Sequence, residues 1–429
     1  MSNVLRIAIA GLGTVGQGTI TILHENAKQI AARCGKTIEI VAASARDTSK
    51  KRNVFLQGIR IETDAMALAT APDIDLVVEL IGGDEGIAKQ LVEAAIAHGK
   101  HVVTANKALI AHHGLALAKA AEAKGVVLAF EAAVAGGIPI IAGLRQGLSA
   151  NRITRVSGIL NGTCNFILTT MARDGRDYDD VFGEAVKLGY VEADPALDID
   201  GIDAAHKVSI LAALAFGTAP DFAAVHAEGI RRITLLDIET AASFGYAIKL
   251  LGLAAYEDGE LSQRVQPCLV PLASPLAAVS GSFNAVQVEG DAVGRVVFEG
   301  RGAGGGPTGS AVVSDIISIA RGDTFPPFTV PAAELKHAKP ANAAAHKGRY
   351  YLRLSLKDEP GVLAEFTRAF AEASISVHSI TQRAAIPGHS AQVIVITHDT
   401  NEGSVANAAA AIAKLPVSVA APVVLRIEN

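Results

Sequence analysis

The sequence predicts an α/β protein in three parts: a doubly wound parallel sheet, an α+β region and a C-terminal βαββαβ module. Three observations support this prediction. Short, almost wholly apolar runs alternate with helical patterns over residues 1–150, as in parallel sheets buried on both faces. The alternation becomes irregular over 151–322. After a segment with four prolines (323–348), residues 349–429 follow the order strand, helix, strand, strand, helix, strand.

Composition narrows the class of protein. The 429 residues suit two to three domains. Half of the residues are hydrophobic and 19% are charged, which excludes wholesale disorder. The net charge of −5 gives no general attraction to nucleic acid or to anionic lipid. Three widely spaced cysteines, an odd number, and a start without signal-peptide layout predict a cytoplasmic protein with reduced thiols.

One segment is nearly long enough to cross a membrane. Between Lys124 and Arg145 the only charged residue is Glu131. The segment also contains two consecutive glycines and Pro139. We therefore predict a buried strand, a turn and the start of a helix here, and no membrane span.

A glycine-rich motif follows the first apolar run. Residues 5–10 predict a strand, the sequence GLGTVG covers 11–16, and a helical pattern comes next. This order is the context that a dinucleotide-binding fingerprint requires. Gly11 would make the tight turn, Gly13 would admit a pyrophosphate, and Gly16 would let helix and strand pack closely. The helix start at Thr14 and Val15 would offer N–H groups to the phosphates. We predict a Rossmann-type domain over 1–150; the alternative is a tight turn alone.

The second strand, 38–43, ends beside cations. Arg46 and Lys50 follow it, with Asp47 between them. Cations at this point suit a 2′-phosphate, so NADP(H) is favoured over NAD(H). Asp47 keeps NAD(H) open, and an ordinary solvated loop is the alternative.

Further strands at 75–81, 101–104 and 126–130 extend the predicted sheet. Parallel sheets bind ligands at the carboxyl ends of their strands. Thr104, Asn106 and Lys107 fall at one such end. We expect these residues to meet a cofactor or substrate, although Lys107 alone would also fit a loop charge.

The middle region has strands predicted at 153–160, 264–269, 285–288 and 295–299. A second glycine-rich loop covers 300–308 and precedes an apolar helix at 311–320. Its place before a helix permits contact with a phosphate or nicotinamide, and a flexible connection is the alternative. We expect the helix to pack back on the first domain.

An acidic segment ends at Lys207. Residues 189–207 carry five carboxylates and one lysine, and a helical pattern follows Gly201, with Asp198 or Asp200 as the predicted N-cap. Asp203 and Lys207 are four residues apart and so share one face of this helix. Such a pair is usually a solvated ion pair, but this helix is otherwise apolar and is predicted to be buried. The pair is therefore a candidate proton-transfer site.

The C-terminal module has strands predicted at 351–356, 375–382, 392–397 and 417–427, with helices from 360 and over 403–414. The order is that of a ferredoxin-like fold.

Seven blocks, taken together, resemble homoserine dehydrogenases of the long form, with a C-terminal ACT domain. They are GLGTVG (11–16), VVELIGG (77–83), VVTANKAL (102–109), FEAAVAGGIPII (130–141), GILNGTCNFIL (158–168), GYVEADPALDIDGIDAAHK (189–207) and GAGGGPTGSAVVSD (302–315). They lie in the family's order. One departure is the run of three glycines at 304–306, which leaves open whether Gly304 is the glycine that contacts cofactor.

The resemblance implies reversible NAD(P)(H)-dependent interconversion of L-aspartate 4-semialdehyde and L-homoserine, in threonine, methionine and isoleucine biosynthesis. It implies an acid/base role for Lys207, with Asp203 as its partner. It also implies further contacts, with substrate at Glu192, Asp198, Thr163, Tyr190 and Lys107, and with cofactor at Lys107 and Gly189.

The family also binds a monovalent cation, usually sodium. The side chain of Glu131 and the carbonyls of Val134, Gly136 and Ile138 occupy the matching positions. A cation would explain a carboxylate in an apolar run. The alternative is a glutamate that is protonated or bound by N–H groups.

The ACT-like module implies feedback inhibition, with L-threonine as the expected effector. Such modules bind small amino acids between two copies, so a homodimer or homotetramer is expected. The domains are assigned as 1–150 dinucleotide-binding, 151–322 catalytic and dimerisation, 323–348 linker and 349–429 ACT.

Two other functions compete with this interpretation. Another amino-acid or aldehyde dehydrogenase on the same scaffold would explain the first glycine motif, but not the NGT and GIDAAHK blocks. A non-catalytic sensor of nucleotide and amino acid would have no use for Lys207.

Overall fold

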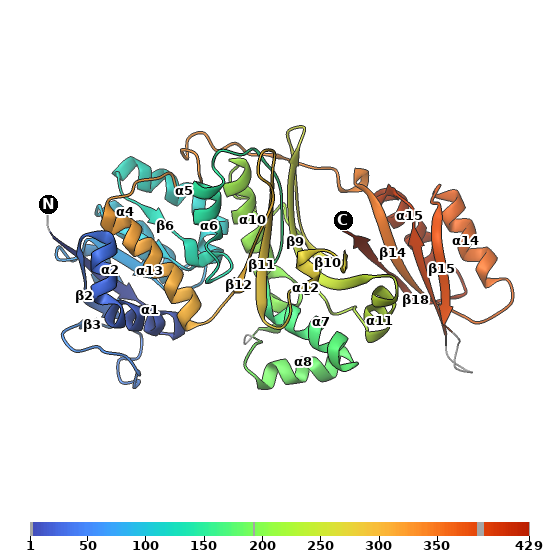
Figure 1. Cartoon of the computed structure of the whole chain (residues 1–429), viewed down its shortest axis with the longest axis horizontal. Coiled ribbons are helices and arrows are strands. Elements are labelled where there is room, and N and C mark those ends of the chain that lie inside the picture. Colours follow the sequence, from blue (N-terminus) through green and yellow to red (C-terminus); the bar gives the residue numbers. More distant parts are fainter. Residues whose placement is uncertain (1–2, 192–193, 384–389, 429) are drawn as a thin grey trace.

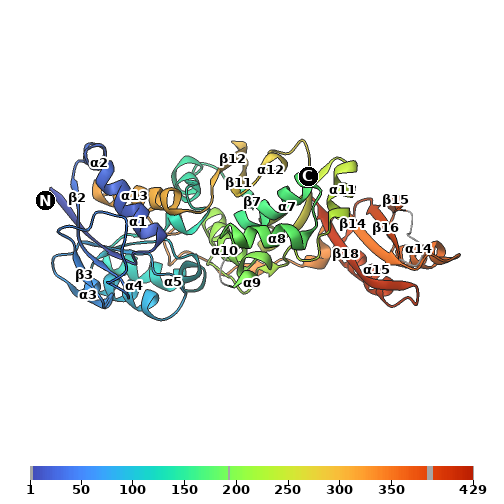
Figure 2. The same ribbon diagram turned by 90° about the horizontal axis from the view of Figure 1, so that it is seen from below.

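The computed structural model describes residues 3–191, 194–383 and 390–428, which form three domains in a row (Figure 1). The N-terminal domain lies at one end, the C-terminal domain at the other, and the middle domain joins them. The perpendicular view in Figure 2 shows the same linear order. Within the described ranges, no helix has the length and apolar character that crossing a bilayer needs.

The first domain is a six-stranded, wholly parallel sheet with the strand order β3-β2-β1-β4-β5-β6. The strand order and the parallel direction of the strands confirm the predicted doubly wound sheet. The strands are β1 (Val4–Ala10), β2 (Thr37–Ser44), β3 (Arg60–Glu62), β4 (Leu76–Glu79), β5 (His101–Thr104) and β6 (Leu128–Ala129).

Helices cover both faces of this sheet, because alternate residues of each strand point to opposite sides. In β1, Ala8 and Ala10 pack toward α3 (Met66–Thr70), α4 (Ile87–Ala97) and α5 (Lys107–Lys124). Ile7 and Ile9 pack toward the other helical layer. That layer consists of α1 (Thr14–Glu25), α2 (Ala27–Cys34) and α13 (Gly305–Arg321).

Helix α13 belongs to the first domain in space, although it follows the middle domain in sequence. Figure 1 shows it beside α1 and α2. Val312, Ile316 and Ile319 are buried in the same apolar cluster as Ile7 and Ile9 of β1. The first domain is therefore built from two separate stretches of the chain.

The middle domain contributes five antiparallel strands in the order β12-β11-β7-β9-β10. They are β7 (Ile153–Ile159), β9 (Tyr246–Glu257), β10 (Glu260–Pro271), β11 (Phe283–Gly290) and β12 (Gly294–Arg301). The sequence analysis missed β9, the strand between β7 and β10. Its residues 248–254 are buried on both faces, so it lacks the polar alternation by which a half-exposed strand is recognised.

The helices of the middle domain pack against this sheet or against one another. They are α7 (Gly162–Asp174), α8 (Tyr178–Lys187), α9 (Pro195–Ile199), α10 (Ile202–Phe216), α11 (Leu235–Ser243) and α12 (Pro275–Ala278). Between the first sheet and the middle domain, the chain forms the short turns η1 (Glu131–Ala133), α6 (Ile140–Ala142) and η2 (Gly143–Gly147).

The C-terminal domain has the predicted βαββαβ order. Its strands pair antiparallel as β18-β14-β16-β15. The elements are β14 (Lys347–Leu356), α14 (Val362–Glu372), β15 (Val377–Arg383), β16 (Ala391–Thr397), α15 (Glu402–Ala413) and β18 (Ser418–Ile427). Strand β18 also pairs with β10 at Cys268–Arg426 and Leu269–Ile427, so one sheet continues across the domain boundary.

The predicted linker is a packed connection and not a free tether. The Phe328 side chain is fully buried, with its ring centroid 5.2 Å from that of Phe130. Arg145 stacks on Phe325 and donates to the carbonyl oxygen of Pro327 at 3.1 Å. Further along, β13 (Lys339–Pro340) pairs with β10. Composition indicated a linker because prolines and polar residues outnumber these few apolar anchors.

A buried carboxylate ties the C-terminal domain to the middle domain. Asp237 on α11 is fully buried and accepts hydrogen bonds from Tyr351 Oη at 2.8 Å and Arg353 Nε at 2.7 Å. Its second oxygen accepts bonds from the backbone N–H and the hydroxyl of Thr234, which caps α11. One side chain thus both starts a helix and holds two residues of β14.

A second buried carboxylate attaches α13 to the first domain. Asp315 accepts the backbone N–H of Glu131 at 2.8 Å. Burial, and then the nearby charge of Glu131, raise the pKa of Asp315 to about 7. The Glu131 N–H bond and Arg145 oppose this rise without cancelling it.

We expect Arg353→Met to destabilise the protein, because it leaves the Asp237 carboxylate buried without its cation. Breaking a buried pair from one side costs about 3 to 5 kcal/mol. The measurement is the urea unfolding midpoint. Arg368→Met, on the exposed side of α14, is the matched control. Equal midpoints for the two variants would show that the contact adds no stability.

The raised pKa of Asp315 makes stability depend on pH. Between about pH 4 and pH 7 the folded protein holds this proton more firmly than the unfolded chain, so stability falls as pH rises. Asp315→Asn removes this dependence and keeps an oxygen that can accept the Glu131 N–H. The free energy of unfolding of this variant, relative to the wild type, should rise by up to about 1.4 kcal/mol per pH unit over that interval. Urea titrations at pH 5, 6 and 7 measure it, with exposed Asp258→Asn as control; a constant difference contradicts the prediction.

Candidate functional site

The loop after β1 presents a helix N-terminus at the carboxyl edge of the first sheet. Gly11 has a φ of 105°, and a Cβ there would lie 2.5 Å from the carbonyl oxygen of Leu80. A Cβ on Gly16 would lie 2.1 Å from the carbonyl oxygen of Gly11, so neither position accepts a side chain. Helix α1 begins at Thr14 behind Gly13, which has no side chain to cap it. The first N–H groups of α1 are therefore suited to binding an anion.

A cavity of about 750 Å³ lies beside this loop. Arg46 and Lys50 line it, together with Gly13. The Asp47 carboxylate accepts bonds from the hydroxyl and backbone N–H of Ser49, at 2.6 and 2.9 Å, and these bonds lower the pKa of Asp47. Asp47 therefore organises its own loop, and it lines the same cavity as the two cations.

Thr104 is buried beneath the site and is held there by hydrogen bonds. Its hydroxyl donates to Glu79 Oε2 at 2.6 Å and accepts the backbone N–H of Asn106 at 2.9 Å. The other oxygen of Glu79 accepts two backbone N–H groups of the turn after β4. Asn106 caps α5, which begins at Lys107. Thr104 thus fixes the start of the helix that carries Lys107, and its side chain is engaged there.

The predicted pair on α10 lies inside the protein. Lys207 Nζ donates to Asp203 Oδ2 at 2.8 Å and to the carbonyl oxygen of Leu160 at 2.7 Å. Both side chains of the pair are 10% exposed, so this is not a solvated surface ion pair. Lys107, from the other domain, lies 3.1 Å from Asp203 Oδ1. Two lysines from two domains thus share one carboxylate.

The charge of Asp203 is fixed by these neighbours. Burial alone would raise the pKa of Asp203, but Lys207 and then Lys107 outweigh it and hold the pKa well below its usual range. Asn161 adds a hydrogen bond from Nδ2 to Asp203 Oδ2 at 3.0 Å. Asp203 therefore stays an anion and can orient both ammonium groups.

The predicted N-cap of α10 was wrong. The N-cap is Gly201, with a φ of 83°. Asp198 lies within α9, where Asn161 Nδ2 donates to its Oδ1 at 2.8 Å. Asp200 pairs with Arg231 at 2.5 Å. The acidic residues before α10 therefore serve the cavity and a neighbouring loop, and a left-handed glycine turns the chain between α9 and α10.

The Asp203 cluster lines a second cavity, of about 560 Å³. Thr163, Gly189, Tyr190 and Gly304 line it as well. The Thr163 hydroxyl donates to the carbonyl oxygen of Tyr190 at 2.8 Å. Glu192, a predicted substrate ligand, lies outside the described residues. The structure therefore brings the second glycine loop and the acidic segment to one space.

The first glycine loop lies between the two cavities. Gly13 lines the first cavity and Val15 lines the second. A dinucleotide laid across this loop would reach from the Arg46 side to the Lys207 side. The glycine turn, the helix N-terminus and the two cavities fit such a cofactor.

Glu131 is bound by N–H groups. Its oxygens accept the backbone N–H of Ile141 at 2.8 Å and of Ala142 at 2.7 Å, at the start of α6. Burial raises the pKa of Glu131 in spite of these bonds. The carbonyl of Ile138 accepts a bond from Ile140 N at 2.8 Å. A cation is thus not needed to satisfy the carboxylate.

The loop that holds the other predicted cation ligands supports the second cavity. Val134 is fully buried in it. A Cβ on Gly136 would lie 2.3 Å from the carbonyl oxygen of Gly302, so this loop packs directly under the second glycine loop.

Sequence reasoning gave no role to several polar residues at the site, among them Asn161, Glu79 and Arg301. Asn161 joins Asp198 to Asp203, Glu79 braces Thr104, and Arg301 lines the second cavity. Asn161 carried a usable signal, because an asparagine directly before a helical pattern indicates an N-cap, and its Oδ1 does accept the Cys164 N–H. Arg301 and Glu79 gave no comparable signal.

Comparisons with known proteins agree with this geometry. Family models match as the NAD-binding domain of homoserine dehydrogenase (11–131), homoserine dehydrogenase (139–317) and the ACT domain (350–417). A homoserine dehydrogenase of Pseudomonas aeruginosa is 45% identical, over 99% of both chains. The crystal structure of a homoserine dehydrogenase from Thiobacillus denitrificans superposes with a TM-score of 0.93 at 44% identity, over 99% of this chain and 98% of that one.

A hyperthermophilic archaeal homoserine dehydrogenase, solved in complex with NADPH, matches with a TM-score of 0.62 at 28% identity. The match covers 73% of this chain and 97% of the archaeal chain. On the combined matches to domain models, full-length relatives and solved structures, the chain belongs to the homoserine dehydrogenase family, NAD(P)-dependent oxidoreductases that act on a CH–OH group.

Proposed function

We propose that Lys207 is the acid/base group in the interconversion of L-homoserine and L-aspartate 4-semialdehyde. One observation carries this proposal: Lys207 Nζ is buried at the cavity, held by Asp203 and the carbonyl of Leu160. An ammonium has three N–H donors, and these two bonds use two of them. The third position is available to the reacting oxygen of a substrate.

The chemistry requires a proton and a hydride to leave the alcohol. A bound nicotinamide supplies the acceptor for the hydride from the carbinol carbon. Lys207, as a neutral amine, takes the hydroxyl proton; in the reverse direction the ammonium returns it to the aldehyde oxygen. Asp203 orients the amine. Because the amine must be neutral first, homoserine oxidation should gain rate toward alkaline pH.

The substrate ammonium would be held by carboxylates of the acidic segment. Asp198 lines the cavity and is fixed by Asn161. Glu192, from the same segment, is proposed as its second ligand. Thr163 and Tyr190 would form the wall, and Lys107 would stand between cofactor and substrate.

For the cofactor we propose NADP(H) over NAD(H). Arg46 and Lys50 line the first cavity, where a 2′-phosphate would need cations, and Asp47 is engaged by Ser49. The archaeal relative solved with NADPH supports this preference. The glycine loop, including Thr14, Val15 and Gly16, would hold the pyrophosphate, with Gly189 and Gly304 near the nicotinamide.

We also propose a sodium site near Glu131, with carbonyls of Val134, Gly136 and Ile138 as ligands. The burial of the Glu131 carboxylate in an apolar segment supports this site. The N–H bonds to Glu131 and the bond to Ile138 mean that such an ion would act mainly by stiffening the loop under the second cavity.

The ACT domain supports regulation by a small amino acid, and we propose L-threonine as the effector. A homodimer or homotetramer is the proposed assembly, as in other proteins whose ACT domains meet. The unpaired buried cysteines fit a reducing compartment, and we place the enzyme in the cytoplasm.

Lys207→Ala should lower kcat about 10²- to 10⁴-fold, the usual contribution of a general acid or base. NADPH oxidation with aspartate semialdehyde measures this loss. Lys187→Ala, on the exposed end of α8, is the control. Near-normal turnover of the Lys207 variant would refute the assignment. Lack of turnover in the wild type would favour a sensor, and turnover with a different substrate would favour another dehydrogenase.

Arg46→Ala should raise KM for NADPH about tenfold, the effect of one lost bond to a charged group, and leave KM for NADH nearly unchanged. Steady-state titrations with both cofactors measure this split. Lys28→Ala, exposed on α2, is the control. An equal rise for both cofactors would mean that Arg46 does not read the 2′-phosphate.

A further inference from the structure

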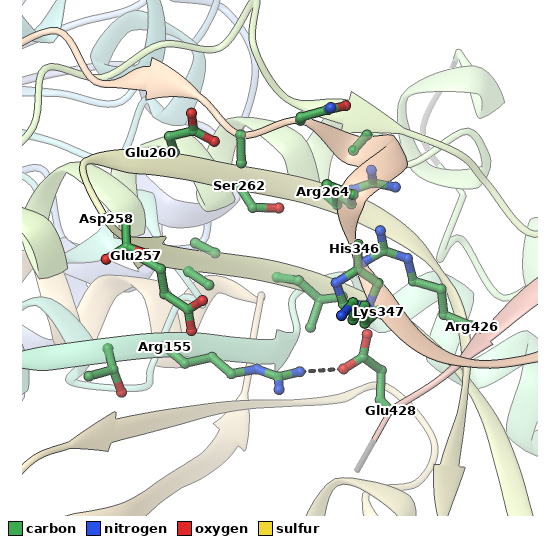
Figure 3. A pocket seen from close by; sticks show the side chains of 18 of the residues that line it. Arg155, Glu257, Asp258, Glu260, Ser262, Arg264, His346, Lys347, Arg426 and Glu428 are labelled. Atoms are coloured by element: carbon green, nitrogen blue, oxygen red, sulfur yellow. Dashed lines mark hydrogen bonds and ion pairs between the residues drawn. The ribbon is translucent and has the colours of Figure 1, made fainter. Parts of the chain in front are cut away.

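One buried lysine of the middle domain has no carboxylate beside it. Two arginines that line a cavity of about 650 Å³ are neutralised by carboxylates (Figure 3). Arg155 pairs with Glu428. Arg264 pairs with Glu402. Lys249 on β9 is only 2% exposed, and within the described ranges the structure gives it no ion pair. Burial lowers its pKa to about 8. Burying an unpaired ammonium is costly, so its hydrogen bonds must matter to the protein.

Lys249 is bonded to the turn that precedes β11, residues 279–283. Its Nζ donates to the carbonyl oxygen of Val279 and, at 3.2 Å, to Asn165 Oδ1. Asn165 lies on α7 and is 1% exposed. Its Nδ2 donates at 3.3, 3.0 and 3.2 Å to three carbonyl oxygens of the same turn, those of Val279, Gly281 and Phe283. A lysine and an asparagine from two elements therefore hold one turn by its carbonyl groups.

This turn contributes to the wall of the second cavity. Ser282, within the turn, lines the cavity, and so does Asn284 just after it. A Cβ on Gly162, the first residue of α7, would lie 2.7 Å from the carbonyl oxygen of Ser282. A Cβ on Gly302, in the second glycine loop, would lie 2.2 Å from Asn284 Nδ2. Residues 282 and 284 are therefore in direct contact with the start of α7 on one side and with the glycine loop on the other.

The two segments that meet here carry the two proposed reactants. Thr163, next to Gly162, is proposed to contact the substrate, and Gly304, close to Gly302, is proposed to lie near the nicotinamide. Hydride transfer requires the reacting atoms to be about 3 to 3.5 Å apart, and a misplacement of about 1 Å can lower the rate about 10²-fold. The spacing between these two segments therefore matters to the chemical step.

We infer that Lys249 and Asn165 are positioning residues for hydride transfer. They hold the turn 279–283, and the turn with Asn284 fixes how far the substrate lies from the nicotinamide. Neither residue belongs to the wall of the second cavity, so both act through the turn. The inference rests on the proposed function, because it needs a substrate at Thr163 and a nicotinamide at Gly304. It adds a separate role, since Lys207 moves the proton and this network aligns the hydride.

The competing explanation is that the network only stabilises the fold. Carbonyl groups that face the interior must be bonded, and Lys249 would satisfy them whether or not the turn faced a substrate. Both explanations predict that loss of Lys249 lowers stability. Only the positioning role predicts a slower chemical step in enzyme that is still folded.

The test is Lys249→Met in the full-length enzyme, because methionine has a similar length and lacks the ammonium. Hydride transfer is followed in a single turnover, as loss of NADPH with saturating aspartate semialdehyde. We expect its rate to fall about 10- to 100-fold, the effect of a misplaced reactant. KM for NADPH should stay nearly unchanged. NADPH deuterated at C4 of the nicotinamide should slow the same step, which identifies it as hydride transfer.

Lys100→Met is the matched control. Lys100 is also buried, and its Nζ donates to the carbonyl oxygens of Ala71 and Ile74 at 2.6 and 2.7 Å. It precedes β5, at the edge of the first sheet opposite to the glycine loop. Lys100→Met should therefore lower the urea unfolding midpoint and leave the single-turnover rate unchanged.

A milder variant keeps the test decisive if Lys249→Met does not fold. Thr169 on α7 accepts the backbone N–H of Gly281 at 3.1 Å through its hydroxyl oxygen. Thr169→Val preserves the shape of the side chain and removes this bond. The single-turnover rate should fall about 3- to 10-fold, the effect of one lost hydrogen bond.

The outcomes separate this inference from the proposed function. If the wild type reduces aspartate semialdehyde and the folded Lys249 and Thr169 variants keep its single-turnover rate, the inference is wrong and the proposed function stands. If these variants raise KM for NADPH and leave the single-turnover rate unchanged, the turn serves cofactor binding and the inference is again wrong. If the wild type does not reduce aspartate semialdehyde, both are wrong.

Discussion

The Asp203 carboxylate, shared between Lys207 and Lys107, is the interaction on which the candidate active site depends. A carboxylate inside a protein is stable only when cations or donors surround it, and here they come from three segments. Lys207 lies on α10, Lys107 begins α5 in the first domain, and Asn161 caps α7. Each segment is therefore held at the same point. Because one buried carboxylate must contact a lysine from each domain, it sets the distance between the cofactor domain and the substrate domain.

Much of this arrangement follows from the sequence. The parallel sheet is predicted from apolar runs alternating with helices, and the pair on α10 from a four-residue spacing inside an apolar helix. Those signals are local, because helical and strand periods place neighbours on known faces. The βαββαβ order of the last domain is equally local. The resemblance to a family added residue roles that periodicity alone does not provide.

Other features depend on contacts that local patterns do not contain. Strand β9 has two buried faces and so no alternation. Phe328 anchors the supposed linker because Gly114 leaves room for its ring. Glu79 contacts Thr104 because β4 and β5 lie side by side in the sheet. Gly201, and not an aspartate, is the N-cap of α10 because the chain must turn sharply between α9 and α10. In each case the feature depends on a contact with a residue far away in the sequence, or on the backbone geometry that a turn requires.

The position of α13 has a consequence for how the chain can be made and divided. The apolar layer beside α1 and α2 is complete only when residues near 320 are present. On the ribosome, the nucleotide-binding half must therefore wait for most of the polypeptide before one side of its sheet is closed. Transfer of that half to another protein, in evolution or in the laboratory, would need to include two distant gene segments. A single contiguous segment would lack α13 and would leave an apolar surface exposed to solvent.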